Sequence, residues 1–229
     1  MQKERGRYKM KGKKKKKIVF VCMGNTCRSP MAEMLFRKKT IELGLTGLEV
    51  CSAGVKAAVG EKMNEKSAQI LMDKGFEPHS FVAKQMDGKL LKESLAIVCM
   101  TDALRDLVME LRWNALREAG EEEIENNVYS FSELAGYEIL DPYGRDADCY
   151  RYVYELLAGG MSALTDKLLP PSVRKNYVAK PKTPRKPAAK TTDKTTRSSK
   201  SASGKKTAKK PAVKTPRKSA TKKKSAEKS

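Results

Sequence analysis

The stretch IVFVCMGNTCRSPMAEM, residues 18–34, decides the fold of this chain. It opens with four apolar residues, and such a continuous run is typical of a strand buried on both faces. Cys22 ends the run, Arg28 follows after five intervening residues, and a helical pattern begins directly afterwards. The stretch therefore predicts a strand, a short loop and a helix, with a thiol at one end of the loop and a guanidinium at the other.

Further apolar patterns predict the other elements. Strands are expected at three more runs: 48–53, 95–100 and 128–131. Helices are expected at about 29–43, at about 64–74, after Thr101, and after the DPYGRD loop of 141–146 until Pro170. Gly159 and Gly160 interrupt the apolar period of the last helix.

Because helices separate strands that are each a continuous apolar run, we expect a parallel sheet covered on both faces. The fold class is thus α/β: a doubly wound three-layer sandwich around a central four-stranded parallel sheet. Ligands of such folds bind outside the carboxyl ends of the strands. Cys22 and the 141–146 loop both follow strands in this way, so we expect them to meet.

The net charge of +21 divides the 229 residues into three parts. Residues 1–17 carry ten Lys or Arg against one Glu (+9), and residues 171–229 carry twenty-one against two acidic residues (+19). Residues 18–170, with seventeen basic and twenty-four acidic residues, have a charge of −7. We therefore expect a mildly acidic domain at 18–170 between two basic arms, which have too little apolar content to fold and should be disordered.

The two arms are expected to bind polyanions such as DNA or RNA. The composition of the C-terminal arm resembles the Lys/Ala/Pro-rich tails of linker histones and bacterial nucleoid proteins, and KTPRK occurs in it at both 182–186 and 214–218. The C-terminal arm lacks interleaved aromatic residues for base stacking. Binding should therefore be non-specific, directed at phosphates and salt-dependent, in association with the nucleoid or the ribosome.

The five cysteines are an odd number, and Cys51 and Cys99 lie in strand-like runs. This pattern favours free thiols in a reducing compartment over a disulfide framework. Apolar runs are far shorter than the roughly 20 residues that a membrane span needs. We therefore expect a cytoplasmic monomer without a transmembrane segment.

The loop after Cys22 has the composition of a phosphate-binding site around a nucleophile. Its backbone N–H groups and the start of the following helix would favour an anion there. Arg28 adds a guanidinium fork that matches two phosphate oxygens, and Ser29 can donate a hydrogen bond to the thiolate. Gly24 and Asn25 tolerate the positive φ that a tight loop requires. The predicted phosphate-binding loop consists of Met23, Gly24, Asn25, Thr26, Cys27 and Ser29.

The motif VCMGNTCRSPMAE, the SAG of 52–54 and the DPYG of 141–144 together resemble the low-molecular-weight protein-tyrosine phosphatase family over about 18–168. The resemblance implies a protein phosphatase without metal or cofactor. In it Cys22 attacks phosphorus, Arg28 holds the phosphate oxygens and Asp141 is the general acid. By pattern alone, an Asp before Pro is usually a turn residue, and Asp146 and Asp148 are nearby rivals.

Three residues bear on the substrate. Thr26 is the residue expected in the protein arginine phosphatase branch of the family, where tyrosine-directed members have Ile or Val. Tyr143 matches an aromatic residue of the loop that carries the general acid, residues 141–146 (the acid loop), and suits both substrates. Lys56 stands where the arginine branch has a second aromatic residue, and it disfavours a guanidinium unless its side chain points into solvent.

The resemblance also suggests supporting residues. His79 is expected to brace the phosphate-binding loop, through Asn25. Cys27 is either a buried apolar residue or the partner that forms a reversible disulfide with an oxidised Cys22.

Several alternatives remain at this point. Phosphotyrosine is the nearest alternative to phosphoarginine as substrate. An arsenate reductase shares the C-x5-R motif but needs further closely spaced cysteines, whereas Cys99 stands alone and Asp141-Pro142 is present. A nucleic-acid-binding protein with a vestigial phosphatase domain is the alternative from another class, and the intact Cys22 and Arg28 disfavour it.

Overall fold

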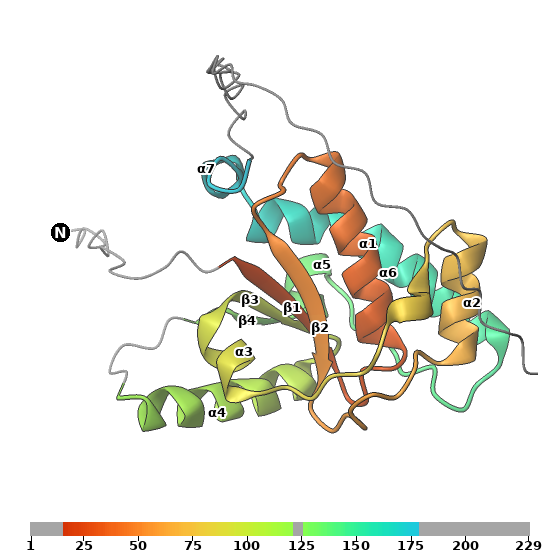
Figure 1. The fold of residues 1–229 in the computed structure, drawn as a ribbon, viewed down its shortest axis with the longest axis horizontal. Helices are drawn as coiled ribbons and strands as arrows, with labels where there is room; N and C mark the ends of the chain where they lie inside the picture. The colour runs from red at the N-terminus through yellow and green to blue at the C-terminus, as the bar shows by residue number, and fades with distance from the viewer. Residues whose placement is uncertain (1–15, 121–125, 179–229) are drawn as a thin grey trace, which may run out of the picture. The chain divides into compact units, whose positions relative to one another are not determined.

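Four parallel strands form the centre of the computed structural model, which describes residues 16–120 and 126–178 (Figure 1). The strands are β1 (Lys17–Cys22), β2 (Glu49–Gly54), β3 (Ser94–Cys99) and β4 (Val128–Ser130), in the order β2-β1-β3-β4. This confirms the predicted α/β fold with a four-stranded parallel sheet. The prediction that the basic arms are disordered concerns mostly residues outside the described ranges.

Helices cover both faces of the sheet, as Figure 1 shows. One side carries α1 (Arg28–Glu42), α2 (Glu65–Asp73) and α6 (Ala147–Leu168), and the other carries α3 (Gly88–Glu93) and α4 (Asp102–Glu118). The remaining helical segments are short: η1 (Pro78–Ser80), α5 (Phe131–Ala135) and α7 (Pro171–Arg174). No helix in the described part of the chain is long and apolar enough to cross a membrane.

The central strand β1 positions the site. Its residues 18–21 are completely buried, because β2 and β3 flank the strand and helices cover both faces. Burying a residue of this kind contributes roughly 1.5–3 kcal/mol to folding. The loop after Cys22 is therefore attached to a strand whose residues 18–21 are fully buried.

The helix α6 is continuous from Ala147 to Leu168, as predicted, and it includes Gly159 and Gly160. A Cβ atom at Gly160 would lie 2.5 Å from ring atoms of Phe131, which is fully buried. Glycine is needed at this position because α5 packs directly on the helix backbone.

The folded part also continues past the predicted boundary at residue 170. Pro171 begins α7, where a missing N–H costs nothing. Tyr177 beyond it is buried, and its carbonyl oxygen accepts a hydrogen bond of 2.9 Å from Gly47 N. At the other end, Lys17 belongs to β1 and pairs with Glu49. The domain therefore includes a few residues that we had assigned to the arms.

Candidate active site

The phosphate-binding loop turns the chain between the end of β1 and the start of α1. Asn25 has a φ of 57°, and no other non-glycine residue in the described ranges has a positive φ. This conformation brings Asn25 N to 3.3 Å from Cys22 Sγ, to which it donates. The expected positive φ is thus confirmed for Asn25, whereas Gly24 does not adopt it.

Ser29 holds the nucleophile as predicted. Its Oγ lies 3.0 Å from Cys22 Sγ and accepts a hydrogen bond of 2.8 Å from Asn25 Nδ2. Because Ser29 Oγ is the acceptor in that bond, its hydroxyl proton remains available to point at the sulfur. Cys22 is 3% exposed and α1 begins just beyond it. The sulfur thus has two hydrogen-bond donors and the N-terminus of a helix beside it.

A buried network braces Asn25 from behind. Its Nδ2 also donates to Ser52 Oγ (2.9 Å), and its Oδ1 accepts from Lys84 N (2.8 Å). Ser52 Oγ in turn donates to Glu33 Oε2 (2.6 Å), and Glu33 pairs with Arg37 on the next turn of α1. All polar atoms of the Asn25 amide are engaged, so the strained conformation of this residue is fixed.

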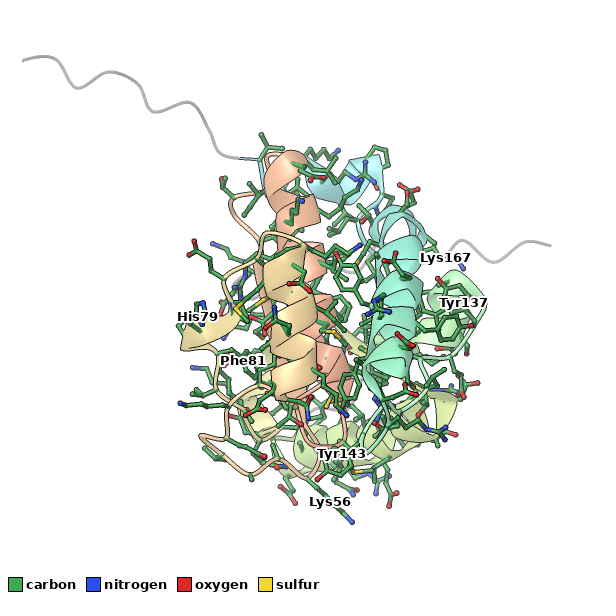
Figure 2. All side chains as sticks on the ribbon, turned by 90° about the vertical axis from the view of Figure 1, so that its right-hand side faces the viewer. Lys56, His79, Phe81, Tyr137, Tyr143 and Lys167 are labelled. Atoms are coloured by element: carbon green, nitrogen blue, oxygen red, sulfur yellow. The ribbon has the colours of Figure 1, made fainter. Side chains whose placement is uncertain are left out.

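This network corrects the role expected of His79. The imidazole is exposed on η1, and it makes no hydrogen bond within the described residues. Figure 2 shows it far from the end of the molecule that carries Tyr143. The backbone of Lys84 and the hydroxyl of Ser52 make the contacts to Asn25 that we had assigned to His79.

Gly54 lets β2 approach the loop closely. A Cβ atom there would lie 2.6 Å from Met23 O and 2.9 Å from Asn25 N. The next residues bond to the same segment, because Val55 N donates to Cys22 O (3.1 Å) and Lys56 N to Met23 O (2.9 Å). The SAG segment is thus a support of the phosphate-binding loop, made of backbone and one hydroxyl.

Arg28 joins the loop to the late part of the chain. The side chain is buried, Nη1 donates to Ile139 O (3.2 Å) and Nη2 pairs with Asp141 Oδ2 (2.5 Å). Its Nε is buried without a partner, and phosphate oxygens are the acceptors that would satisfy it. The structure therefore brings together Arg28 and Asp141, which the sequence separates by more than a hundred residues.

The acid loop holds Asp141 at the edge of the site. The Asp141 side chain is 49% exposed, and its Oδ1 accepts from Tyr143 N (3.2 Å). The rival carboxylates have other roles: Asp146 caps α6 by accepting from Cys149 N (2.8 Å), and Asp148 pairs with Arg151 on the surface. Of these three carboxylates, only Asp141 contacts Arg28 within the described ranges.

The start of α2 links the phosphate-binding loop to the acid loop. This link was not predicted from the sequence. Asn64 N donates to Thr26 O (2.9 Å), and Lys66 Nζ donates to Arg145 O in the acid loop. The Lys66 ammonium also lies 5.5 Å from the centroid of the Tyr150 ring. One signal was available: Asn64 is a favourable N-cap before a helical pattern.

The residues predicted to select the substrate lie around the mouth of the site. Thr26 is partly exposed, and its Oγ1 lies 3.6 Å from Cys27 Sγ. Tyr143 is 74% exposed. Figure 2 shows Tyr143 and Lys56 at the same end of the molecule, where the Lys56 side chain extends outward into solvent.

Cys27 is buried in the wall of the loop, with its Sγ 3.6 Å from Tyr150 Oη. Burial raises the pKa of the Cys27 thiol, which keeps it protonated. Its role as redox partner of Cys22 stays a prediction. If Cys27 has this role, a thiol reductant should restore the activity of enzyme treated with peroxide. The Cys27→Ser variant should not recover its activity in this way.

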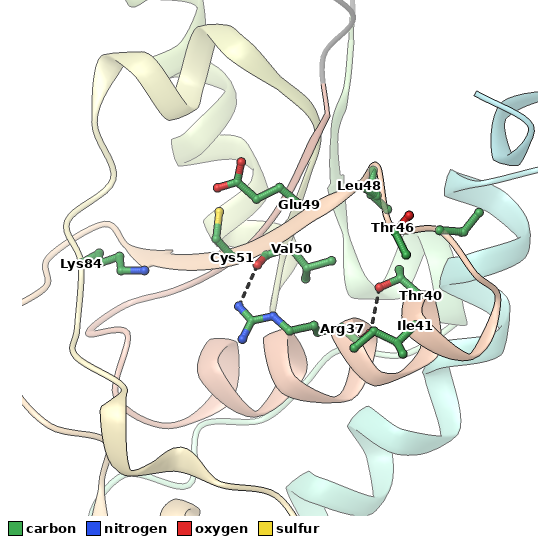
Figure 3. A pocket seen from close by; sticks show the side chains of 10 residues that line it. Arg37, Thr40, Ile41, Thr46, Leu48, Glu49, Val50, Cys51 and Lys84 are labelled. Carbon is green, nitrogen blue, oxygen red and sulfur yellow. Dashed lines mark hydrogen bonds between the residues drawn. The ribbon is translucent and has the colours of Figure 1, made fainter. Parts of the chain in front are cut away.

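A pocket between α1 and the edge strand β2 is separate from the phosphate-binding loop (Figure 3). Its cysteine is Cys51, and Arg37 lies in it with its guanidinium donating to Val50 O (3.0 Å). Burial, together with the charges of Glu33 and Glu49, raises the pKa of Cys51 to about 11. This thiol stays protonated at neutral pH and does not compete with Cys22 as a nucleophile.

A thiol on a phosphate-binding loop, faced by an arginine and a carboxylate at the carboxyl end of a parallel sheet, defines a cysteine-based phosphatase of the α/β class. The model of the family "Low molecular weight phosphotyrosine protein phosphatase" matches residues 17–176. The chain belongs to this family, as its motifs indicated, and is a low-molecular-weight protein phosphatase.

Its relatives include both arginine and tyrosine phosphatases. The chain is 33% identical over 156 residues to a protein-arginine-phosphatase of Geobacillus stearothermophilus, covering 66% of this chain and 95% of the relative. It is 32% identical over 143 residues to the tyrosine phosphatase PtpB of Staphylococcus haemolyticus (62% and 91% covered).

The similar solved structures also include both arginine and tyrosine phosphatases. The YwlE arginine phosphatase of G. stearothermophilus has a TM-score of 0.56 at 30% identity, with 67% of this chain and 92% of that chain covered. The tyrosine phosphatase AmsI of Erwinia amylovora has a TM-score of 0.57 at 26% identity (71% and 98% covered). The fold is thus shared by arginine and tyrosine phosphatases.

Proposed function

We propose that this phosphatase hydrolyses phosphoarginine in proteins through a phosphocysteine intermediate. The observation that carries the choice of substrate is Thr26 in the phosphate-binding loop, beside an acid loop that presents Asp141 and Tyr143. The similarity to the arginine phosphatase of G. stearothermophilus supports the choice.

The first step transfers the phosphoryl group to Cys22. The phosphate oxygens take hydrogen bonds from the loop N–H groups and from Arg28, whose Nε is unpartnered and whose Nη2 exchanges Asp141 for phosphate. The Cys22 thiolate attacks phosphorus, and the P–N bond to the guanidine breaks. Asp141, released from Arg28 and protonated, gives its proton to the leaving nitrogen.

The second step returns the enzyme to its starting state. Asp141 takes a proton from a water molecule, the hydroxide oxygen attacks phosphorus, and the P–S bond breaks to release inorganic phosphate. Ser29 donates to the sulfur as it leaves, through the contact of 3.0 Å. Each step therefore uses the same hydrogen bond to stabilise the thiolate, first as nucleophile and then as leaving group.

Thr26 favours a guanidinium for two reasons. Its hydroxyl can accept a hydrogen bond from a guanidinium N–H, which an Ile or Val side chain cannot do. Thr is also smaller and less apolar than Ile. It therefore leaves room for a planar polar group such as a guanidinium and offers less apolar contact to a phenyl ring. A missing hydrogen bond to a charged group costs roughly 1.5–3 kcal/mol.

The neighbouring side chains are compatible with a cationic substrate. Tyr143 presents an exposed ring that can stack on a guanidinium. Lys56 is exposed and extends away from the domain, so its charge lies in water, where repulsion is weak. The repulsion between Lys56 and a cationic guanidinium is therefore weaker than the sequence position of Lys56 indicates.

Replacing Thr26 by Ile should move the preference toward phosphotyrosine. We expect kcat/KM on a phosphoarginine peptide to fall about tenfold or more, because a hydrogen bond to a charged group is lost, while kcat/KM on a phosphotyrosine peptide holds or rises. Thr26→Ser, which keeps the hydroxyl, is the matched control and should retain the preference. An unchanged ratio in Thr26→Ile would contradict the role of this residue.

Phosphotyrosine is the second candidate substrate. Tyr143 suits a phenyl ring as well as a guanidinium, and the chain is also similar to PtpB of S. haemolyticus. The same pair of peptides separates the two candidates.

The proposal includes a second activity for the basic arms, which is non-specific binding to nucleic acid. Its support is the charge of +9 at residues 1–17 and +19 at residues 171–229, next to a domain of net negative charge. Loss of binding to a DNA duplex as salt rises from low to high concentration is its expected signature, and salt-independent binding would contradict it.

A further inference from the structure

The acid loop is closed into a compact turn by its own hydrogen bonds. Arg145 N donates to Pro142 O (3.0 Å), so the two ends of the turn are held together. Tyr143 N donates to Asp141 Oδ1 (3.2 Å), so the carboxylate is fixed to the same turn. Because these bonds connect residues 141 to 145, a shift of the Arg145 carbonyl group also shifts Asp141.

Lys66 attaches this turn to the start of α2. Its Nζ donates to Arg145 O, at the end of the turn that is farther from Asp141 in the sequence. The same ammonium lies 5.5 Å from the centroid of the Tyr150 ring, and Tyr150 is 1% exposed. A cation is attracted to the face of an aromatic ring. Lys66 therefore contacts the acid loop and a buried ring of α6 at the same time.

The same turn of α2 also holds the phosphate-binding loop. Asn64 N donates to Thr26 O (2.9 Å). Asn64 Oδ1 accepts from Lys66 N (3.0 Å) as the N-cap of the helix. The Tyr150 hydroxyl lies 3.6 Å from Cys27 Sγ in the wall of the loop. The start of α2 thus fixes the acid loop relative to the phosphate-binding loop.

The contact between Asp141 and Arg28 is lost when phosphate binds. In the free enzyme Arg28 Nη2 pairs with Asp141 Oδ2 at 2.5 Å. In the proposed first step this guanidinium turns to the phosphate oxygens, and Asp141 is released with its proton. The bond from Lys66 to Arg145 O uses neither Arg28 nor the phosphate. It therefore remains to hold the acid loop when Arg28 no longer does so.

From this geometry, and resting on the proposed role of Asp141 as general acid, we propose that Lys66 is a positioning residue for the proton transfer. It holds the acid loop through Arg145 O while Asp141 gives its proton to the leaving group. A general acid must lie within hydrogen-bond reach of the atom that it protonates, and a displacement of about 1 Å can cost roughly 10²-fold in rate. Loss of the Lys66 contact should therefore slow the reactions that need an acid and spare those that do not.

The test compares two substitutions at Lys66 with one at Lys74. Lys66→Met keeps the length of the side chain but removes the donor and the charge, whereas Lys66→Arg keeps both. Lys74→Met is the matched control. Lys74 also lies over a ring of α6, at 5.3 Å from the centroid of Tyr154, but its ammonium pairs with Glu155 of that helix (3.1 Å). Both lysines are exposed, so these substitutions should leave the fold intact.

The substrates are phenyl phosphate, whose leaving group needs protonation, and 2,4-dinitrophenyl phosphate, whose leaving group does not. We expect kcat/KM to fall about tenfold on the first and less than about twofold on the second in Lys66→Met. Lys66→Arg and Lys74→Met should retain the wild-type values on both. No change in Lys66→Met, or an equal fall on both substrates, would overturn the inference. So would the same selective fall in Lys74→Met, because the effect would then belong to the packing of α2 on α6.

A double variant separates this inference from the proposed function on which it rests. In Asp141→Asn the side chain has no acidic proton to give, so adding Lys66→Met should cause no further loss on phenyl phosphate. A further loss of about tenfold would mean that Lys66 acts independently of Asp141 and would overturn the inference alone. An equal effect of Asp141→Asn by itself on both substrates would instead contradict Asp141 as the general acid.

Discussion

Replacing Cys22 by Ser is expected to abolish phosphatase activity, with a loss of kcat on the order of 10⁴-fold or more, as for other enzymes that lose their nucleophile. A serine hydroxyl is not ionised at neutral pH, and Ser29 and Asn25 N stabilise a thiolate but supply no base to activate an alcohol. The measurement is turnover of 4-nitrophenyl phosphate together with rapid quench for the phosphorylated enzyme.

The matched control is Cys51→Ser. Cys51 lies in the separate pocket and its thiol stays protonated, so this variant should keep its activity. Retained turnover in Cys22→Ser, or loss of activity in Cys51→Ser with an intact fold by circular dichroism, would contradict the assignment of the nucleophile.

Replacing Asp141 by Asn should lower activity according to the leaving group. The amide keeps the size of the side chain but cannot donate a proton as an acid. We expect kcat/KM to fall by about 10²–10⁴-fold on phenyl phosphate, whose leaving group needs protonation, and far less on 2,4-dinitrophenyl phosphate, whose leaving group does not.

Asp148→Asn provides the comparison for Asp141. Asp148 is exposed and paired with Arg151, away from Arg28, so its replacement should leave both substrates unaffected. If Asp141→Asn affected both substrates equally, Asp141 would act on the position of Arg28 and not as the general acid.

The sequence predicted the sheet because its strands are continuous apolar runs that fill the centre of the domain. The predicted bounds of β1 through β4 agree with the structure to within a residue or so. The helices α3, α5 and α7 were missed, since four to six residues are too few for a periodic pattern to stand out. The reason for a glycine at position 160 could not be predicted, because the ring of Phe131 that requires it belongs to another element.

The part of the site that is formed by residues close together in the sequence was predictable. Cys22, Arg28 and Ser29 lie within eight residues, so chemistry and spacing were sufficient. Asp141 came only from the family resemblance, because an Asp-Pro pair has no specific meaning by itself. The contact between Asp141 and Arg28 depends on how the sheet is assembled.

The support of the loop was not predictable in the same way. Ser52, Glu33 and the backbone of Lys84 come from three separate segments. Backbone donors leave no signal in side-chain identity. The family resemblance suggested this role for His79, yet the side chain is exposed on η1.

The most direct test of the proposed function is the ratio of kcat/KM on two peptides of the same sequence, one with phosphoarginine and one with phosphotyrosine at the same position. With Thr26 in the loop and Lys56 turned to solvent, we predict that the wild-type enzyme prefers the phosphoarginine peptide by about tenfold or more, the value of one hydrogen bond to a charged group. A preference for the phosphotyrosine peptide would contradict the proposed specificity for phosphoarginine.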